Sequence, residues 1–276
     1  MNNTEIFERI DKLFESVDMV RREPEFSTEV GNRQTTEVRD PQSDDEMLER
    51  LASLIAYSKG AKDKFVERLF IDGFFAELFY GFNVVTVARL DVDEWLRENW
   101  RKTKLVRHKG ELVEARVTYI RFKGKIADIV DVARVLLVIQ KEFSSFLEML
   151  NSFGIPRQLH NQADTDLFWH KFRMLKTQLA GYDMPYFANT TSLLHLLLSL
   201  GYDCVKPDSA VQKAVKKIGI VNSTSGDKNL VKTVRTLQEY AVSRNIRTSV
   251  VDFYFLIYGE QSWAKEFVTE SPAPIV

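Results

Sequence analysis

The residues with the clearest chemical potential lie in the segment Met184–Val211. A leucine-rich stretch within it is apolar on nearly every face, which predicts a buried helix that ends at Gly201. Asp208 then follows a proline at the mouth of a second helix, Ala210–Ile218, whose N-cap is either Asp208 or Ser209. A carboxylate in this position is a helix cap far more often than a catalyst, so its surroundings must decide.

Cysteine and histidine offer little metal chemistry. The single cysteine, Cys204, excludes a disulfide or a cysteine-based metal or iron–sulfur site within the chain. The four histidines share no spacing that predicts a metal site. His195 lies within the leucine-rich helix and is expected to be a satisfied core residue. We therefore expect neither a metal nor a cofactor.

Composition predicts an ordinary soluble globular protein. The chain has 276 residues, of which 45% are hydrophobic and 28% charged, enough for a large core in one or two domains. Its first residues carry acids at helical spacing, unlike a signal peptide, and its apolar runs are too short or interrupted to span a bilayer. A cytoplasmic protein is expected, associated with the nucleoid if the source is a bacterium.

Charge is distributed unevenly along the chain although the net charge is only -1. Residues 100–125 contain nine lysines and arginines against two acids, and residues 206–247 contain nine against three. Residues 1–50 are acidic in balance. Each basic run alone is more often a solvated face than a binding face. Together they favour a phosphate-containing partner, because phosphate binding depends on local charge.

Hydrophobic periodicity predicts a mostly α protein with three parts. Residues 1–46 form an amphipathic helix and a polar linker or loose loop, residues 47–270 the main helical domain, and residues 271–276 a tail. Residues 111–122 have mixed periodicity and fit either a short helix or a strand pair. The predicted helices span residues 4–19, 47–57, 62–70, 74–80, 93–100, 126–138, 142–151, 168–179, 210–218, 230–243 and 249–258.

The segment Met184–Val211 begins with a predicted hairpin, which the apolar helix, the glycine, a short loop and the aspartate follow. This order resembles the helix-hairpin-helix DNA glycosylase superfamily. Its members carry an essential aspartate in a V-D-T-H-V-like context, and this chain has Pro207-Asp208-Ser209-Ala210-Val211 there. The likeness covers residues 47–259 and is strongest over 168–220, so the chain is similar to a divergent member. It implies two helical subdomains around a cleft, with the aspartate at a helix N-terminus, so that capping and catalysis are compatible.

The resemblance implies a chemistry for Asp208. Such enzymes flip a base out of the duplex, and a fixed carboxylate stabilises the oxocarbenium character of the sugar while water attacks. Members that also nick the strand use a hairpin lysine as an amine nucleophile. The equivalent position, eighteen residues before Asp208, is Thr190. A threonine cannot form a Schiff base, so the resemblance implies a monofunctional glycosylase without lyase activity.

The resemblance also implies which residues contact DNA. The two hairpin glycines of the family are replaced by Tyr186 and Ala188, which weakens the expected phosphate contact. A lysine near the base pocket opposes a cationic base and suits a neutral or hydroxyl-rich one. The substrate-binding candidates are Tyr57, Ser58, Lys59, Phe122 and Trp169. The candidates for phosphate binding are Asn189, Thr190 and Thr191 in the hairpin, Lys213, Lys216 and Lys217 after Asp208, and Arg121, Lys123 and Lys125 before the middle helix.

Other interpretations stay open. The degenerate hairpin favours a catalytically silent helix-hairpin-helix module that binds DNA or a protein. A glycosylase acting on hypermodified bases of foreign (phage) DNA is another alternative, and an unrelated helical scaffold is a third. For the main interpretation we expect double-stranded DNA as the partner of a monomer that does not bind membranes.

Overall fold

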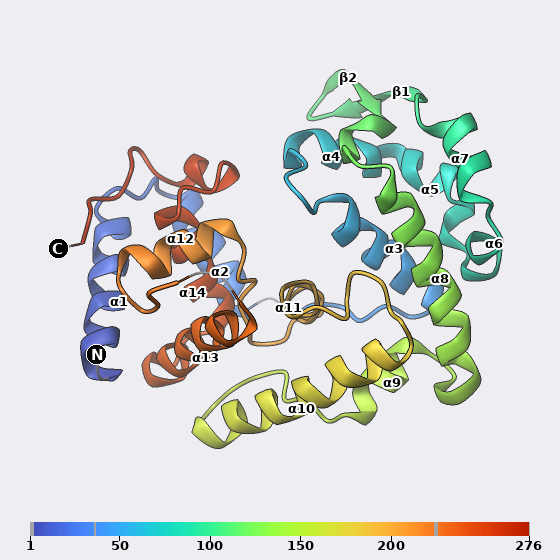
Figure 1. Cartoon of the computed structure of the whole chain (residues 1–276). Helices are drawn as coiled ribbons and strands as arrows, with labels where there is room; N and C mark the ends of the chain where they lie inside the picture. The colour runs from blue at the N-terminus through green and yellow to red at the C-terminus, as the bar shows by residue number, and fades with distance from the viewer. Residues whose placement is uncertain (1–2, 36, 224–225, 276) are drawn as a thin grey trace. The chain divides into compact units, whose positions relative to one another are not determined.

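The computed structural model describes residues 3–35, 37–223 and 226–275. These residues form a mostly helical chain with one two-stranded sheet (Figure 1). The chain divides into two compact units. We call residues 1–39, 155–173 and 189–276 the terminal unit, and residues 40–154 and 174–188 the middle unit.

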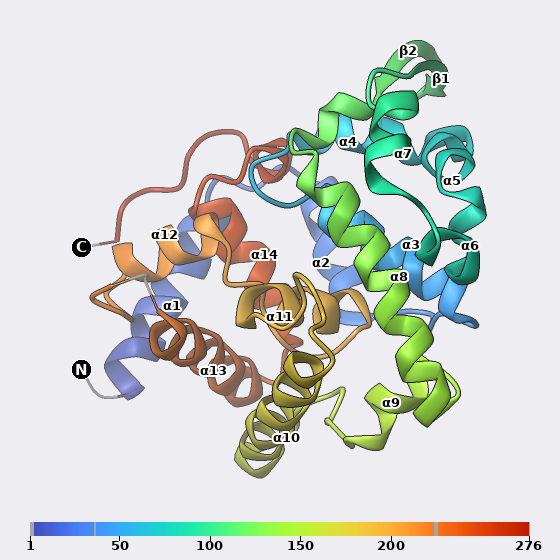
Figure 2. The same cartoon turned by 45° about the vertical axis from the view of Figure 1, so that its right-hand side comes forward.

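In the middle unit, helix α8 is the central element. Its apolar length packs against α3, α6 and α9, and it runs beside α3 in two views (Figures 1 and 2). Ser43 caps α3 by accepting a hydrogen bond from the Glu46 N–H. Its elements are α3 (Asp44–Ala56), α4 (Asp63–Phe70), α5 (Phe74–Leu78), α6 (Val84–Ala88), α7 (Val92–Asn99), β1 (Thr103–His108), β2 (Glu111–Arg116), α8 (Gly124–Phe143) and α9 (Phe146–Ser152).

In the terminal unit, helix α14 is the centre of the core, since every residue from Val250 to Tyr258 is buried. Helices α1, α2, α12 and α13 pack against it. Helix α10 contributes residues up to Arg173 to this unit and the rest to the middle unit. The elements are α1 (Asn3–Asp18), α2 (Glu25–Thr35), α10 (Gln162–Gly181), α11 (Thr190–Ser199), α12 (Ser209–Lys217), α13 (Asp227–Arg244) and α14 (Thr248–Tyr258).

The N-terminal region differs from the sequence prediction. The first helix is confirmed, but the expected polar linker contains α2. A single apolar side chain explains this, because Phe26 is buried and its ring packs against those of Phe253 and Tyr254. Arg33 at the end of α2 also lies over the ring of Phe253. Because this segment is mostly polar, its sequence does not indicate a helix that packs on the core through one face only.

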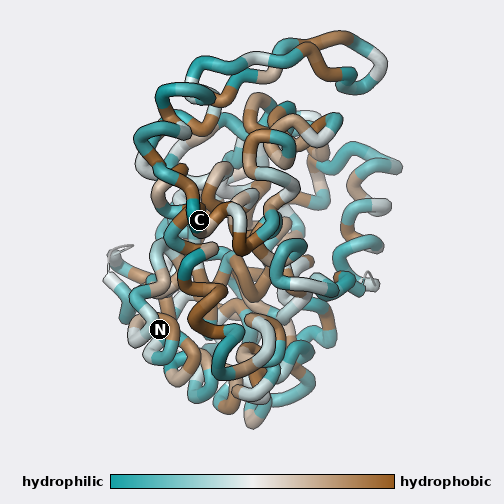
Figure 3. The backbone as a smooth tube through the Cα atoms, turned by 90° about the vertical axis from the view of Figure 1, so that its right-hand side faces the viewer, coloured by the Kyte–Doolittle hydropathy of each residue, from teal (hydrophilic) through white to brown (hydrophobic). Residues whose placement is uncertain are grey.

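Hydrophilic and hydrophobic residues are interspersed along the backbone (Figure 3). Within the described part of the chain, no helix is both long enough and apolar enough to cross a membrane.

Gly259 allows α14 and α12 to approach one another closely. A Cβ added to Gly259 would lie 2.6 Å from the carbonyl carbon of Ala210 and closer still to its oxygen. We expect Gly259→Ala to lower the free energy of unfolding by about 3 kcal/mol or more, because backbone rather than a flexible side chain must move. Urea unfolding of the full chain measures this.

Gly31→Ala is the matched control for this prediction. Gly31 lies inside α2, and an added Cβ would have no neighbour within 4 Å. The control should leave stability unchanged or raise it by about 0.5–1 kcal/mol, since alanine favours a helix interior. Equal stability of the two variants would contradict the close contact between α12 and α14.

Candidate functional site

Of the two N-cap candidates, Asp208 and Ser209, the structure selects Asp208 as the N-cap of α12. Its Oδ1 accepts hydrogen bonds from the backbone N–H groups of Ala210 at 3.0 Å and Val211 at 3.1 Å. The residue is half-buried. Within the described part of the chain, no group donates a hydrogen bond to Oδ2. The carboxylate is therefore fixed through one oxygen, and its other oxygen remains available for a water or a ligand.

A second carboxyl, on Asp252 of α14, lies within electrostatic range of Asp208. Asp252 is only 3% exposed, and its nearest cation is Arg33, whose Nη1 lies 3.9 Å from Oδ2. Oδ1 of Asp252 has no hydrogen-bond partner among the described residues. Burial raises the pKa of Asp252 to about 7, Arg33 opposes the rise, and Asp208 adds to it. Below pH 7 the two carboxyls therefore do not both carry charge.

Sequence reasoning missed the role of Asp252, although a signal existed. Asp252 is the one charged residue in the apolar run of α14. A lone carboxyl in a helix that is apolar all round must be buried, and a buried carboxyl has a perturbed pKa.

His195, on α11, is half-buried, and one of its ring nitrogens is unsatisfied. Its Nδ1 has no hydrogen-bond partner among the described residues, which corrects the expectation of a satisfied core histidine. Burial lowers the pKa of His195 to about 3, and the charge of Lys206 adds to the effect. The imidazole is therefore neutral at physiological pH.

The loop before Asp208 is held by a buried ion pair. Oδ1 of Asp203 lies 2.5 Å from Nε of Arg247, and its Oδ2 accepts a hydrogen bond from the Leu159 N–H at 3.1 Å. Arg247 also donates to the carbonyl of Gly201 at 3.0 Å. Both oxygens of Asp203 are thus occupied, which makes it a structural residue. Asp208 is the carboxylate in this loop that is free to react.

Trp169 does not have the predicted role. It is 1% exposed, and its Nε1 donates a 2.8 Å hydrogen bond to Oε1 of Gln238. Its ring packs against Phe168 and Phe172 on the same helix. Trp169 is a core residue of the terminal unit and is not available to a base.

In the middle unit, the three residues that follow α3 differ in accessibility. Tyr57 is half-buried against the ring of Phe70, and burial raises the pKa of its hydroxyl to about 12. Ser58 is buried and its hydroxyl donates to the Ile55 carbonyl at 2.6 Å, so it cannot serve as a substrate contact. Lys59 is exposed, and its ammonium is 4.0 Å from Asp128. Only Tyr57 and Lys59 remain candidates.

Lys125 is also placed differently from the prediction. It is 1% exposed, and its Nζ donates to the carbonyls of Ala56 at 2.8 Å and Ser58 at 2.7 Å. Burial lowers the pKa of Lys125 to about 8, and the charges of Lys59 and Arg121 add to the effect. The ammonium caps the end of α3 and does not face a phosphate.

The residues just before Lys125 stay accessible. Arg121 is exposed with a φ of +70°, and its Nη1 donates to the Gly60 carbonyl at 2.7 Å. Phe122 is 46% exposed, and Lys123 is exposed beside the ring of Trp100. Two cations and an aromatic ring are therefore presented next to the segment that carries Lys59.

The hairpin lies where the chain passes from the middle to the terminal unit. Tyr186 adopts a φ of +62°, the left-handed conformation that glycine takes readily. Asn189 caps α11 by accepting from the Ser192 N–H, and Thr191 is half-buried. Thr190 is buried and its hydroxyl donates to Asp227 at 2.9 Å, so this side chain is not a phosphate contact.

The three lysines of α12 are exposed, as their spacing predicts. Glu260 binds two of them, with Nζ of Lys213 at 2.7 Å and of Lys217 at 3.2 Å. These lysines lower the pKa of Glu260 to about 2, Lys213 having the larger effect. Lys216 has no ion pair among the described residues. It is the cation of this helix that is most available to a phosphate.

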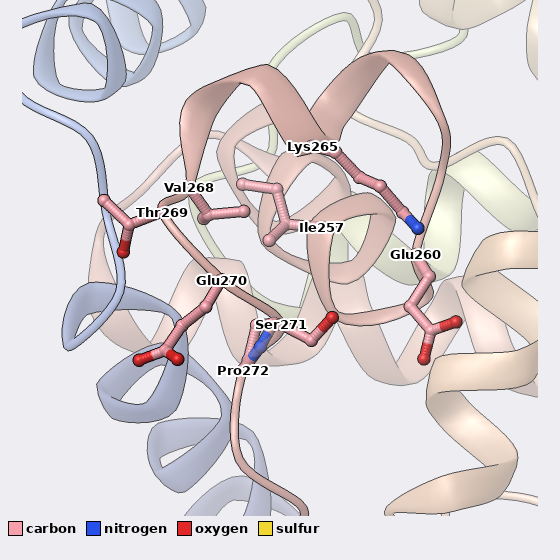
Figure 4. Close-up of a pocket in the computed structure, with 8 residues that line it drawn as sticks. All are labelled: Ile257, Glu260, Lys265, Val268, Thr269, Glu270, Ser271 and Pro272. Carbon is pink, nitrogen blue, oxygen red and sulfur yellow. The ribbon is translucent and has the colours of Figure 1, made fainter.

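A small pocket of about 180 Å³ lies where the tail passes the end of α14 (Figure 4). Its lining includes Ile257, Val268 and Pro272 with the charged residues Glu260, Lys265 and Glu270. This is below the roughly 300–1,000 Å³ that is usual for small-molecule sites, and no predicted site residue lines it.

The structure thus places Asp208 and the α12 lysines in the terminal unit, and Tyr57, Lys59 and the Arg121–Lys123 segment in the middle unit. Among the described residues, no cluster of three or more His, Cys, Asp or Glu side chains could hold a metal ion. Comparison of the chain with protein-family models, with curated proteins and with solved structures gives no match.

Proposed function

We propose that the protein is a monofunctional DNA N-glycosylase of the helix-hairpin-helix type. It flips a damaged or modified base out of duplex DNA and hydrolyses the N-glycosidic bond. The observation that carries this proposal is the geometry of Asp208, which is fixed through Oδ1 and leaves Oδ2 free. A carboxylate held in this way can sit beside a developing positive charge without reorganising.

The proposed step uses one water molecule. Its oxygen bonds to the anomeric carbon and its proton passes to Oδ2 of Asp208, while the bond to the base breaks and the electron pair leaves with the base. The base then takes a proton from solvent. A protonated Asp252 avoids a second negative charge nearby.

Duplex binding in this proposal depends on exposed cations. Lys216 on α12 and Arg121 and Lys123 in the middle unit are accessible to phosphates. Tyr57, Lys59 and Phe122 in the middle unit remain candidates for contact with the DNA. The proposal includes double-stranded DNA as the partner, a monomeric protein, and a cytoplasmic location that is nucleoid-associated in a bacterium.

The reaction product gives a direct test. A panel of duplexes, each with one damaged or hypermodified base, is incubated with the protein and analysed on denaturing gels. We expect one of them to accumulate abasic DNA that stays unbroken until alkali is added, because Thr190 is buried, bound to Asp227 and has no amine. Trapping of a covalent protein–DNA adduct by borohydride would contradict a monofunctional enzyme.

The same panel separates the alternatives. Tyr186 and Ala188 in place of the hairpin glycines favour a silent DNA-binding module. Such a module would bind the duplexes without releasing any base. Release confined to bulky modified pyrimidines would favour action on foreign DNA over repair.

A further inference from the structure

Strands β1 and β2 form an isolated antiparallel ribbon in the middle unit. They pair in continuous register from Thr103↔Arg116 to His108↔Glu111. The connection is the two-residue turn Lys109-Gly110, in which both residues have a positive φ, of 49° and 87°. This is the turn geometry that suits a tight hairpin. The ribbon lies at one end of the middle unit, where β2 packs against α4 (Figures 1 and 2).

The two faces of the ribbon have different environments. Val106 and Ala115 are fully buried on the inner face. On the outer face, Leu105 is 66% exposed and Leu112 is 64% exposed. Leu105 pairs with Glu114, and Arg107 pairs with Leu112, so the two leucines are diagonal neighbours on one surface. The outer face is thus an apolar pair that the fold leaves uncovered, beside a cation.

The charge around these leucines is strongly positive. Residues 101–116 contain six lysines and arginines against Glu111 and Glu114. Lys104 is bound by Glu77 at 2.6 Å, and Arg116 is paired with Glu114. Four cations in the ribbon or just before β1 are exposed and have no ion pair among the described residues: Arg101, Lys102, Arg107 and Lys109.

We propose that the outer face of this ribbon, Leu105, Arg107, Lys109 and Leu112, binds the groove of duplex DNA. The cations would contact phosphates on either side, and the leucines would lie against sugars and base edges. A two-stranded ribbon fits the width of the major groove. Unpaired cations match the polyanionic backbone, whereas a second copy of the chain would bring like charges together. The inference rests on the proposed function only in taking DNA as the partner.

The test uses the full chain and an unmodified duplex, so that it reads binding without base release. Binding is followed by fluorescence anisotropy at several salt concentrations. Arg107→Gln with Lys109→Gln should reduce the slope of log affinity against log salt by about 1.8, about 0.9 for each phosphate that the protein no longer neutralises. Leu105→Ser with Leu112→Ser should weaken binding while leaving that slope unchanged, because no charge is removed.

Arg97→Gln with Lys141→Gln is the matched control. It also removes two positive charges, but from exposed positions on α7 and α8 of the middle unit. An equal loss of binding in the control would mean that only net charge matters, and the inference would be wrong. Normal binding by both ribbon variants would also overturn it. Leucine-dependent self-association in sedimentation, or leucine-dependent binding to anionic vesicles with DNA binding intact, would assign the face to another partner.

The outcomes for the ribbon and for the catalytic proposal are separable. If the ribbon variants bind normally while wild-type protein releases a base, this inference fails and the proposed function stands. If the ribbon variants bind DNA weakly and no base is ever released, the ribbon is a DNA contact of a silent module. If wild-type protein binds no duplex at all, both proposals fail.

Discussion

Replacing Asp208 by asparagine is expected to lower the rate of base release by about a hundredfold to a thousandfold, the range seen when one electrostatic contact to a transition state is removed. The amide oxygen can still accept the hydrogen bonds from Ala210 and Val211, so the cap of α12 is retained. The variant lacks the negative charge that matches the oxocarbenium-like sugar and the base that takes the proton of water. Single-turnover assays on the best duplex of the panel measure this rate.

The matched control is the same substitution at another N-cap. Asp91 caps α7 in the middle unit by accepting from the Glu94 N–H at 2.9 Å. Asp91→Asn should release the base at the wild-type rate, and neither variant should change duplex affinity. Full activity of Asp208→Asn would show that this residue is a cap alone and would remove the basis of the proposed function.

Asp252 and His195 should have opposite effects on how stability depends on pH. The folded state holds the pKa of Asp252 near 7, above its ordinary value of 3.8. The contribution of the protonated Asp252 carboxyl to the free energy of unfolding is therefore fully present below pH 3.8 and is lost as pH rises through 7. The pKa of His195 is near 3, below its ordinary value of 6.5. Stability from the neutral imidazole is complete above pH 6.5 and is lost as pH falls through 3.

Each of these effects amounts to about 4–5 kcal/mol, because a pKa shift of one unit corresponds to about 1.4 kcal/mol. Between about pH 4 and pH 6.5 the two slopes have opposite signs, so they nearly cancel in the wild-type protein. This pair therefore contributes little net pH dependence, although each group alone contributes much.

Two single variants should reveal the hidden slopes. In Asp252→Asn the effect of His195 is unopposed. The free energy of unfolding of this variant, relative to wild type, should therefore rise by about 1.4 kcal/mol for each unit by which pH increases. In His195→Gln the effect of Asp252 is unopposed. The free energy of unfolding of this variant, relative to wild type, should fall by the same amount for each unit by which pH increases. Urea unfolding across this pH range measures both, and the double variant is the control that should follow wild type. Parallel curves for all four proteins would contradict these pKa shifts.

The sequence by itself determined the local structure of this protein. The amphipathic helix at the N-terminus, the leucine-rich α11 and the cap at Asp208 are all observed. These features depend on contacts within one or two turns of chain, and residue spacing encodes such contacts directly. The exposed lysines of α12 follow from the same periodicity.

Contacts between distant segments were decided only by the tertiary structure. Lys125 looked like one more cation of a basic run, but it is turned inward to carbonyls at the end of α3. Trp169 finds its partner in Gln238, and α2 forms because Phe26 reaches the rings of α14. The ribbon needs two strands in register. The pattern of residues 111–122 left a strand pair open as one alternative, but it did not indicate Thr103–His108 as the partner strand. Whether a charged or aromatic side chain faces water or core depends on what packs over it, and a single sequence does not record that partner.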